Sequence, residues 1–171
     1  MNQTPSLTFV EAIKKCFSNY ANFNGRARRS EFWWWYLFSL IVSCIINVPL
    51  QMLISKKQAM VAQATNAMLT GGNVNMAEIE ANDPTNTIII LGIIAVIISL
   101  ALLLPSLAVM ARRLHDVGKS GHMMWLYLLC GVGGLIPLVM CIPDGNPTPN
   151  QYGESPKYMN PVPPVQPQPQ M

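Results

Sequence analysis

The chain has 171 residues, enough for one domain; 51% of them are hydrophobic, 11% are charged, and the formal net charge is +3. A soluble domain carries about 25% charged residues, so this composition excludes an ordinary soluble globular domain. The four cysteines form no C-x-x-C pair, which excludes a zinc ribbon or a disulfide framework and favours free, inert thiols.

Residues 1–32 form the first segment, which we expect to be cytoplasmic, amphipathic and basic. Thr8 followed by Glu11 has the spacing of a capping box and predicts the start of a helix, and Asn24-Gly25 predicts its end. The apolar residues that recur at helical spacing are Val10, Ile13, Phe17 and Tyr20. Such a helix either lies in the lipid interface, with its lysines toward phosphates, or packs on the protein's own spans; the sequence leaves both open.

A basic and aromatic stretch follows this segment. Its members are Arg26, Arg28, Arg29, Phe32, Trp33, Trp34, Trp35 and Tyr36. Indole and phenol rings favour the headgroup zone, where arginine reaches the phosphates, so we predict an anchor at the point where the first span enters the bilayer. The long uncharged run directly behind it argues against a nucleic-acid patch and against a removable signal peptide.

Three segments contain no Asp, Glu, Lys, Arg or His: residues 33–54, 88–111 and 123–142. A charge-free apolar run of about 18 residues is long enough, as a helix, to cross the hydrocarbon core of a bilayer. Each span carries one proline that is expected to bend it, namely Pro49, Pro105 and Pro137. We therefore predict an all-α membrane protein: three transmembrane helices in a membrane domain over 33–142, a short N-terminal amphipathic helix and a disordered proline-rich tail.

Two polar segments lie outside these spans. Residues 55–87 are expected to form a long loop, with a short helix over 58–69 as an alternative. Within it, Asp83-Pro84 is expected to provide the cap and first position of the next helix. Residues 143–171 hold nine of the fourteen prolines, so we expect a disordered or polyproline II tail.

The distribution of Lys and Arg predicts the orientation, because cytoplasmic loops carry the excess of these residues. With three spans, eight of the eleven lie before the first span or between the second and third, and three lie on the other side. We therefore expect the N-terminus inside, and the 55–87 loop and the tail outside. A re-entrant piece, at Pro49 or over 58–69, would place the tail inside.

The connector between the second and third spans concentrates charge. Arg112 and Asp116 are four residues apart and are expected to pair on one helical face. Gly118 and Gly121 are expected to supply the positive φ angles of the turn. The sequence "GKS" resembles part of a phosphate-binding loop, but that motif requires glycine where Arg113 stands.

Catalytic and metal chemistry at this connector finds little support. His115 and Asp116 are suitable metal ligands, but the only other histidine is His122 and further ligands are missing. No spacing pairs a serine or cysteine nucleophile with a base. We therefore predict no metal, no cofactor, no catalytic residue and no enzymatic activity. The role we favour is a structural clasp, in which the Arg-Arg and His-Asp pairs contact the N-terminal Arg–Glu segment.

In "NFNGRARRSEFWWWYLF", "ARRLHDVGKSGHMMWLYLL" and "PDGNPTPNQYGESP" the chain resembles the DUF805 family of small bacterial membrane proteins, over residues 9–156. The matching positions are Phe23, Gly25, Arg26, Arg29, Glu31, Trp33, Arg112, Arg113, Leu114, His115, Asp116, Gly118, Lys119, Ser120, Gly121, Asn150, Tyr152 and Gly153. His122 and Met123-Met124 replace part of the family's aromatic run, the 55–87 loop is longer, and the proline tail is an addition. The resemblance implies an integral inner-membrane protein and supplies no established activity.

The function we favour is a structural or interaction role in the bacterial inner membrane, for a multi-pass protein whose basic rim contacts anionic lipid or a partner. The candidate contact residues are Arg26, Arg28, Arg29, Arg112, Arg113 and Lys119. The candidate structural motif is Gly25, Glu31, Trp33, His115, Asp116, Gly118 and Gly121. A second copy or another membrane protein is considered as partner beside lipid, and nucleic acid is not expected. The alternatives are a subunit of an oligomeric transporter or channel and, ranked lower, a membrane enzyme using His115 and Asp116.

Overall fold

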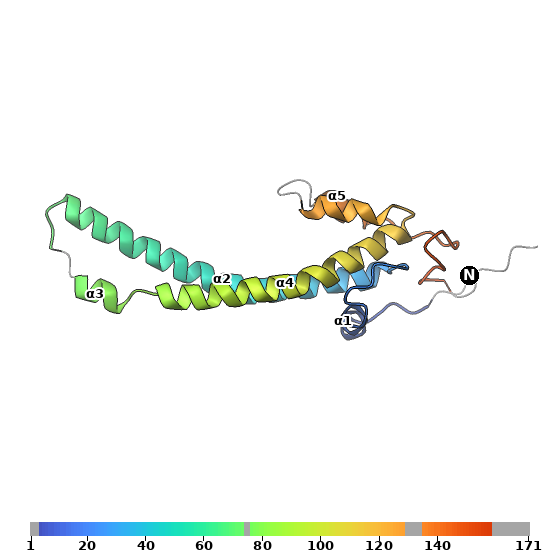
Figure 1. Ribbon diagram of the computed structural model, residues 1–171, viewed down its shortest axis with the longest axis horizontal. Coiled ribbons are helices and arrows are strands. Elements are labelled where there is room, and N and C mark those ends of the chain that lie inside the picture. Colours follow the sequence, from blue (N-terminus) through green and yellow to red (C-terminus); the bar gives the residue numbers. More distant parts are fainter. Residues whose placement is uncertain (1–3, 74–75, 129–134, 159–171) are drawn as a thin grey trace, which may run out of the picture. The chain divides into compact units, whose positions relative to one another are not determined.

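The computed structural model describes residues 4–73, 76–128 and 135–158 (Figure 1). These residues are mostly helical, and the only β pairing among them is an isolated bridge between Asn150 and Gly153. The elements are α1 (Phe9–Ser18), α2 (Arg29–Leu69), α3 (Met76–Ala81), α4 (Thr85–Asp116), the 3-10 helix η1 (Gly121–Leu128) and α5 (Leu135–Met140). The chain divides into two compact units: unit 1 is Met1–Phe38 with Leu103–Met171, and unit 2 is Ser39–Leu102.

Helix α1 begins as the capping box predicts. The Glu11 carboxylate accepts hydrogen bonds from the backbone N–H and the hydroxyl of Thr8, at 2.9 and 2.8 Å. Ala12 and Cys16 are fully buried, whereas Val10 and Phe17 on another side are 57% and 46% exposed. Helix α1 therefore packs on the protein, as the second alternative has it, and Phe17 also contacts the ring of Trp35. A position in the lipid interface stays a prediction.

Helix α2 is longer than its apolar run. It begins at Arg29 and continues to Leu69, so residues 55–69 are helical, which agrees with the alternative of a helix over 58–69 and not with a loop from residue 55. Lys56 and Lys57 interrupt the hydrophobicity but not the helix, because the Gln, Ala and Met residues that follow are strong helix formers. The helix ends where Gly71 takes a φ of +71°.

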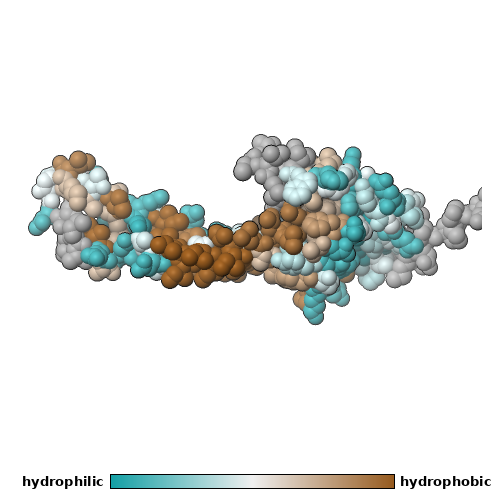
Figure 2. Space-filling model, in the orientation of Figure 1, coloured by the Kyte–Doolittle hydropathy of each residue, from teal (hydrophilic) through white to brown (hydrophobic). Residues whose placement is uncertain are grey.

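Helix α4 starts where the sequence predicts and ends later. The Asp83 carboxylate accepts hydrogen bonds from the N–H and the hydroxyl of Thr85, at 3.0 and 2.6 Å, and so caps the first turn. The helix runs to Asp116, five residues beyond its charge-free part, so the motif that follows Ala111 is helical. Figure 2 shows an almost unbroken hydrophobic surface along a stretch of α4.

In unit 2, α2 and α4 pack against each other. Ile54 of α2 and Ile88 of α4 line one pocket, and the Lys57 ammonium lies 3.6 Å from the Asp83 carboxylate. Within the described ranges, α2 and the helical region that ends at Asp116 are the two helices long and apolar enough to span a membrane.

The predicted third span, 123–142, does not run as one spanning helix in the described residues. The chain forms η1 and the six-residue α5, which contact each other, while residues 129–134 lie outside the described part. Gly121 lies against His115, and the Cys141 and Pro143 carbonyls accept hydrogen bonds from Arg113. The residues on both sides of this segment thus contact the C-terminal end of α4, and the prediction of a third span over 123–142 is not confirmed by the described residues.

The segment that follows is also more ordered than its prolines predict. Residues 143–158 lie against the N-terminal segment; for example, the Thr4 N–H donates to the Lys157 carbonyl at 2.9 Å. The prediction of a disordered tail is therefore not confirmed for 143–158, and the proline-rich stretch "NPVPPVQPQPQM" lies within 159–171, outside the described residues. Proline lacks a donor, but its carbonyl and those of its neighbours remain acceptors, and arginine side chains use them here.

Candidate functional site

Five charged side chains are buried together in unit 1, where the N-terminal end of α2 meets the C-terminal end of α4. They are Arg26, Glu31, Arg112, Arg113 and Asp116, each at most 7% exposed. Charged groups are rarely buried unless they are paired, because removing a charge from water costs several kcal/mol. We call this group the rim clasp.

The first half of the rim clasp is centred on Glu31. Its carboxylate lies 2.7 Å from the Arg112 guanidinium and 2.9 Å from the Lys15 ammonium. Glu31, at the start of α2, therefore holds both α1 and α4 through ion pairs. Burial raises the pKa of the neighbouring Cys16 thiol to about 12, which keeps this thiol protonated and unreactive.

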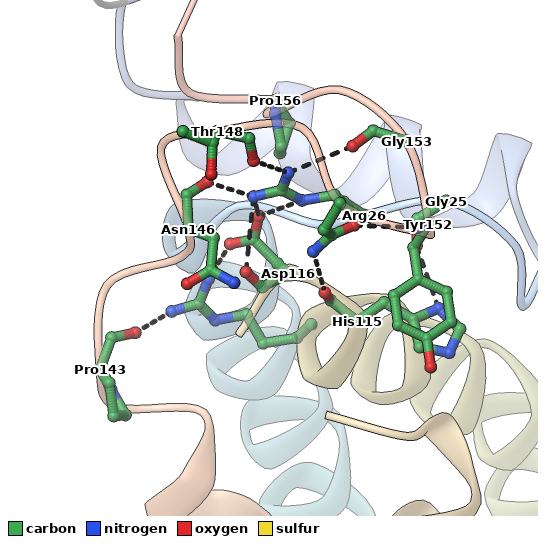
Figure 3. Close-up of polar contacts among 12 residues, drawn as sticks. Gly25, Arg26, His115, Asp116, Pro143, Asn146, Thr148, Tyr152, Gly153 and Pro156 are labelled. Atoms are coloured by element: carbon green, nitrogen blue, oxygen red, sulfur yellow. Dashed lines mark hydrogen bonds and ion pairs between the residues drawn. The ribbon is translucent and has the colours of Figure 1, made fainter. Parts of the chain in front are cut away.

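The second half is centred on Asp116. Its carboxylate accepts a hydrogen bond from Arg26 Nε at 2.9 Å and pairs with Arg113 (Figure 3). Arg26 donates further bonds to the carbonyls of Thr148 at 3.0 Å and Gly153 at 3.2 Å. Two arginines thus share one aspartate and use their remaining N–H groups to hold the C-terminal segment.

The pairing within the motif differs from the expected one. Arg112 was expected to pair with Asp116, but Arg113 pairs with Asp116 and Arg112 pairs with Glu31. Successive residues of a helix point about 100° apart. Arg112 and Arg113 therefore reach different neighbours, one toward α2 and one toward the C-terminal segment.

His115 joins the clasp through its ring and its backbone. Its ring stacks on the ring of Tyr152, with centroids 3.8 Å apart and planes 7° apart, and its Nδ1 lies 3.1 Å from the Gly25 carbonyl (Figure 3). The Asn150 side-chain amide donates to the His115 carbonyl at 2.9 Å. Burial lowers the pKa of His115, so the ring is neutral at pH 7 and its Nδ1–H donates to Gly25.

Three glycines make room for these contacts in different ways. Gly118 has a φ of +73°, as predicted for the turn after α4. Gly121 was expected to serve the same purpose, but it is required for space: a Cβ there would lie 2.6 Å from His115 Nε2. Gly145, which the sequence analysis missed, is tighter still, since a Cβ there would lie 1.8 Å from the Asp116 carboxylate.

The six cations predicted to contact lipid or a partner fall into two groups. Arg26, Arg112 and Arg113 are buried in the clasp, so these three side chains present little surface to lipid or to a partner. Lys119 is exposed, Arg29 pairs with the exposed Asp144 at 3.2 Å, and Arg28 donates to the Pro5 carbonyl at 2.6 Å. Of these last three side chains, those of Arg29 and Lys119 are exposed and that of Arg28 is half-buried.

The aromatic anchor is also divided. Trp33 and Trp34 are each 37% exposed and Tyr36 is 36% exposed, which suits rings at a headgroup boundary. Trp35 is 2% exposed, and its indole N–H donates to the Ser106 hydroxyl at 3.0 Å. Trp35 is therefore part of the core between α2 and α4 in unit 1, and Phe32, the remaining ring of the anchor, is also 2% exposed.

The arrangement holds segments of unit 1 together through ion pairs and through hydrogen bonds to carbonyls. Nε and Nη2 of Arg112 are buried without a hydrogen-bond partner among the described residues, and no group of three or more His, Cys, Asp or Glu that could hold a metal is found in that part of the chain. The clasp predicted between the Arg-Arg and His-Asp pairs and the N-terminal Arg–Glu segment is confirmed. The Asn146 N–H donates to the Asp116 carbonyl at 2.9 Å, and the Asn146 carbonyl accepts from Arg26. The sequence motifs did not reveal Asn146 or Gly145, whereas Asn150, Tyr152 and Gly153 were visible in the family pattern.

Comparison with known proteins finds a family whose match covers the residues of the rim clasp. The family described as "Protein of unknown function (DUF805)" matches residues 20–154, which include every member of the rim clasp. The chain is 31% identical over 140 residues to the inner membrane protein YhaI of Escherichia coli, covering 82% of this chain and 90% of YhaI. It is 29% identical over 143 residues to the inner membrane protein YhaH of the same organism, covering 84% and 93%. No solved structure matches the chain. The chain therefore belongs to the DUF805 family.

Proposed function

We propose that this protein is a multi-pass protein of the bacterial inner membrane with a structural or interaction role. In this proposal α2 and α4 cross the bilayer, and the rim clasp closes the protein at the level of the lipid headgroups. The lengths and apolar surfaces of the two helices support it, as do the names of the two relatives. Two crossings also agree with a segment 123–142 that starts and finishes at the clasp.

The distribution of cations supports a cytoplasmic location for the clasp. With two crossings, nine of the eleven Lys and Arg residues lie on the clasp side, and only Lys56 and Lys57 lie on the other. An excess of this kind is typical of the cytoplasmic side of a membrane protein. The N-terminus and the C-terminal segment then both lie in the cytoplasm, which revises the orientation of the tail.

The interaction surface that we propose is made of the exposed Arg29 and Lys119 beside the clasp, together with the half-buried Arg28. The observation that carries this assignment is the division among the cations: three arginines are buried in the clasp, while Arg28, Arg29 and Lys119 remain at its surface. Juxtamembrane cations contribute about 1 kcal/mol each toward anionic lipid. The exposed rings of Trp33, Trp34 and Tyr36 provide an apolar contact near the same end of α2.

Lipid binding by the purified full-length protein tests this surface. Native mass spectrometry counts the phosphatidylglycerol and phosphatidylcholine molecules that the protein retains from mixed micelles. We expect Arg29→Gln/Lys119→Gln to weaken phosphatidylglycerol binding about tenfold and to leave phosphatidylcholine binding unchanged. The matched control is Lys56→Gln/Lys57→Gln, which removes the same charge elsewhere. Equal losses in both variants, or none in either, would contradict the proposed surface.

A further inference from the structure

A row of polar side chains follows α2 through unit 2. Ser43, Asn47, Gln51 and Ser55 recur at every fourth position, and all four are exposed. With Cys44, Val48 and Met52 they line one continuous groove on the surface of the helix. Of these four, the first three lie within the charge-free segment 33–54, and Ser55 directly follows it. We call them the polar row.

The hydrogen-bonding capacity of the polar row is only partly used within the described chain. The Asn47 amide donates to the Ser43 carbonyl at 2.8 Å and to the Ser43 hydroxyl at 3.1 Å. The Gln51 amide has no hydrogen-bond partner among the described residues. Helix α4 does not cover the row, because it packs on another side of α2, near Ile54 and Lys57.

Two side-chain amides at this position are costly in a bilayer. If α2 spans the membrane, as proposed above, the polar row faces hydrocarbon, where no water is present to bond its donors and acceptors. Polar side chains in membrane helices accordingly bond to neighbouring helices, and small residues such as serine let the backbones approach closely. The row therefore needs a polar partner helix.

We propose that the polar row is the contact surface for a second copy of this chain. An amide carries both a donor and an acceptor, so an identical row is complementary to it across a two-fold axis. All copies insert with the same orientation, which brings Asn47 and Gln51 of the two chains to the same depth. The four-residue spacing follows the i±4 ridge of a helix, which favours a right-handed crossing at roughly −40°.

Cysteine crosslinking in native membranes tests the surface directly. Cys44 is exposed and lines the groove, whereas Cys16 and Cys141 are buried. Single cysteines are placed at positions 43 to 52 in a Cys44→Ser/Cys130→Ala background, and a thiol oxidant is added. We expect covalent dimers to be most abundant at positions 43, 44, 47, 48 and 51 and least abundant at 45, 46, 49 and 50. Absent dimers, a flat profile, or crosslinks only to a different polypeptide would overturn the proposal.

Removing the amides provides a second measurement. Asn47→Leu/Gln51→Leu, combined with the native Cys44, should reduce the crosslinked dimer about tenfold, because each interhelical hydrogen bond is lost twice in a symmetric pair. The matched control is Gln63→Leu/Asn66→Leu, which makes the same changes farther along α2 and should leave the dimer unchanged.

Membrane extraction separates this proposal from the one on which it depends. A protein that leaves the membrane fraction in alkaline carbonate contradicts the proposed membrane crossing. A protein that stays in the membrane fraction but gives no crosslinked dimer contradicts the polar-row interface alone.

Discussion

The substitution Glu31→Gln tests whether the rim clasp holds α1 in place. Glu31 is fully buried and pairs with Arg112, which is 3% exposed, and with Lys15 of α1. The substitution keeps the shape of the side chain but leaves a buried guanidinium without a counter-charge. Breaking a buried ion pair in this way costs about 3–5 kcal/mol, so at the lower limit local opening becomes about a hundredfold more frequent.

Thiol labelling of Cys16 reports this opening, because the residue is fully buried on the face of α1 that packs against the clasp. In membranes, the rate of maleimide attachment to Cys16, resolved by peptide mass spectrometry, should rise about a hundredfold in Glu31→Gln. The control Asp144→Asn removes a carboxylate from an exposed pair with Arg29, and exposed pairs contribute only about 0–1 kcal/mol. A second substitution, Arg112→Met, should restore much of the protection by removing the unpaired charge.

The reasoning would be refuted if Glu31→Gln labelled Cys16 no faster than Asp144→Asn does. The energy of the buried pair would then not stabilise the position of α1. Failure of Arg112→Met to restore any protection would show instead that lost packing, and not the uncompensated charge, is the cause of the opening.

Three further predictions concern the same region. Gly145→Ala should lower the thermal unfolding midpoint in detergent by several degrees, since its Cβ would overlap the Asp116 carboxylate; Gly92→Ala, with nothing within 4 Å of its Cβ, is the control. Burial lowers the pKa of His115 in the folded protein, so its stabilising contribution is complete above its unfolded pKa of about 6.5 and declines as the pH falls below it. The unfolding midpoint should therefore fall between pH 7 and pH 5, and by less in His115→Asn. Finally, reporter fusions should place the C-terminus on the same side of the membrane as the N-terminus; opposite sides would contradict two crossings.

The sequence predicted features in which a local pattern coincides with a local structure. The capping box of Thr8 and Glu11, the start of α4 after Asp83 and the turn at Gly118 each depend on a few neighbouring residues. The clasp was also predictable, because two charged motifs on the same side of two spans have few other partners. The burial of its charged side chains was not predictable, and for this reason Arg26, Arg112 and Arg113 were assigned to contacts with lipid or a partner.

The failures share a different cause. Hydropathy records the length of an apolar run but not where its two ends are held, so it did not show that the residues on both sides of 123–142 contact the C-terminal end of α4. Lys56 and Lys57 end an apolar run, yet helix propensity is what continues α2 to Leu69. The role of Gly145 depends on a carboxylate 29 residues earlier in the chain, and no local pattern encodes that proximity.

The rim clasp has a consequence for the order in which the protein matures. Arg26 leaves the ribosome early, but the aspartate and the carbonyls that it bonds belong to residues 116, 148 and 153. In the orientation proposed above, this guanidinium therefore stays hydrated in the cytoplasm while α2 and α4 are being inserted. Final closure waits until residue 153 has emerged, so a chain that terminates before it would possess its hydrophobic helices but would remain open at the end where its own cations need to be enclosed.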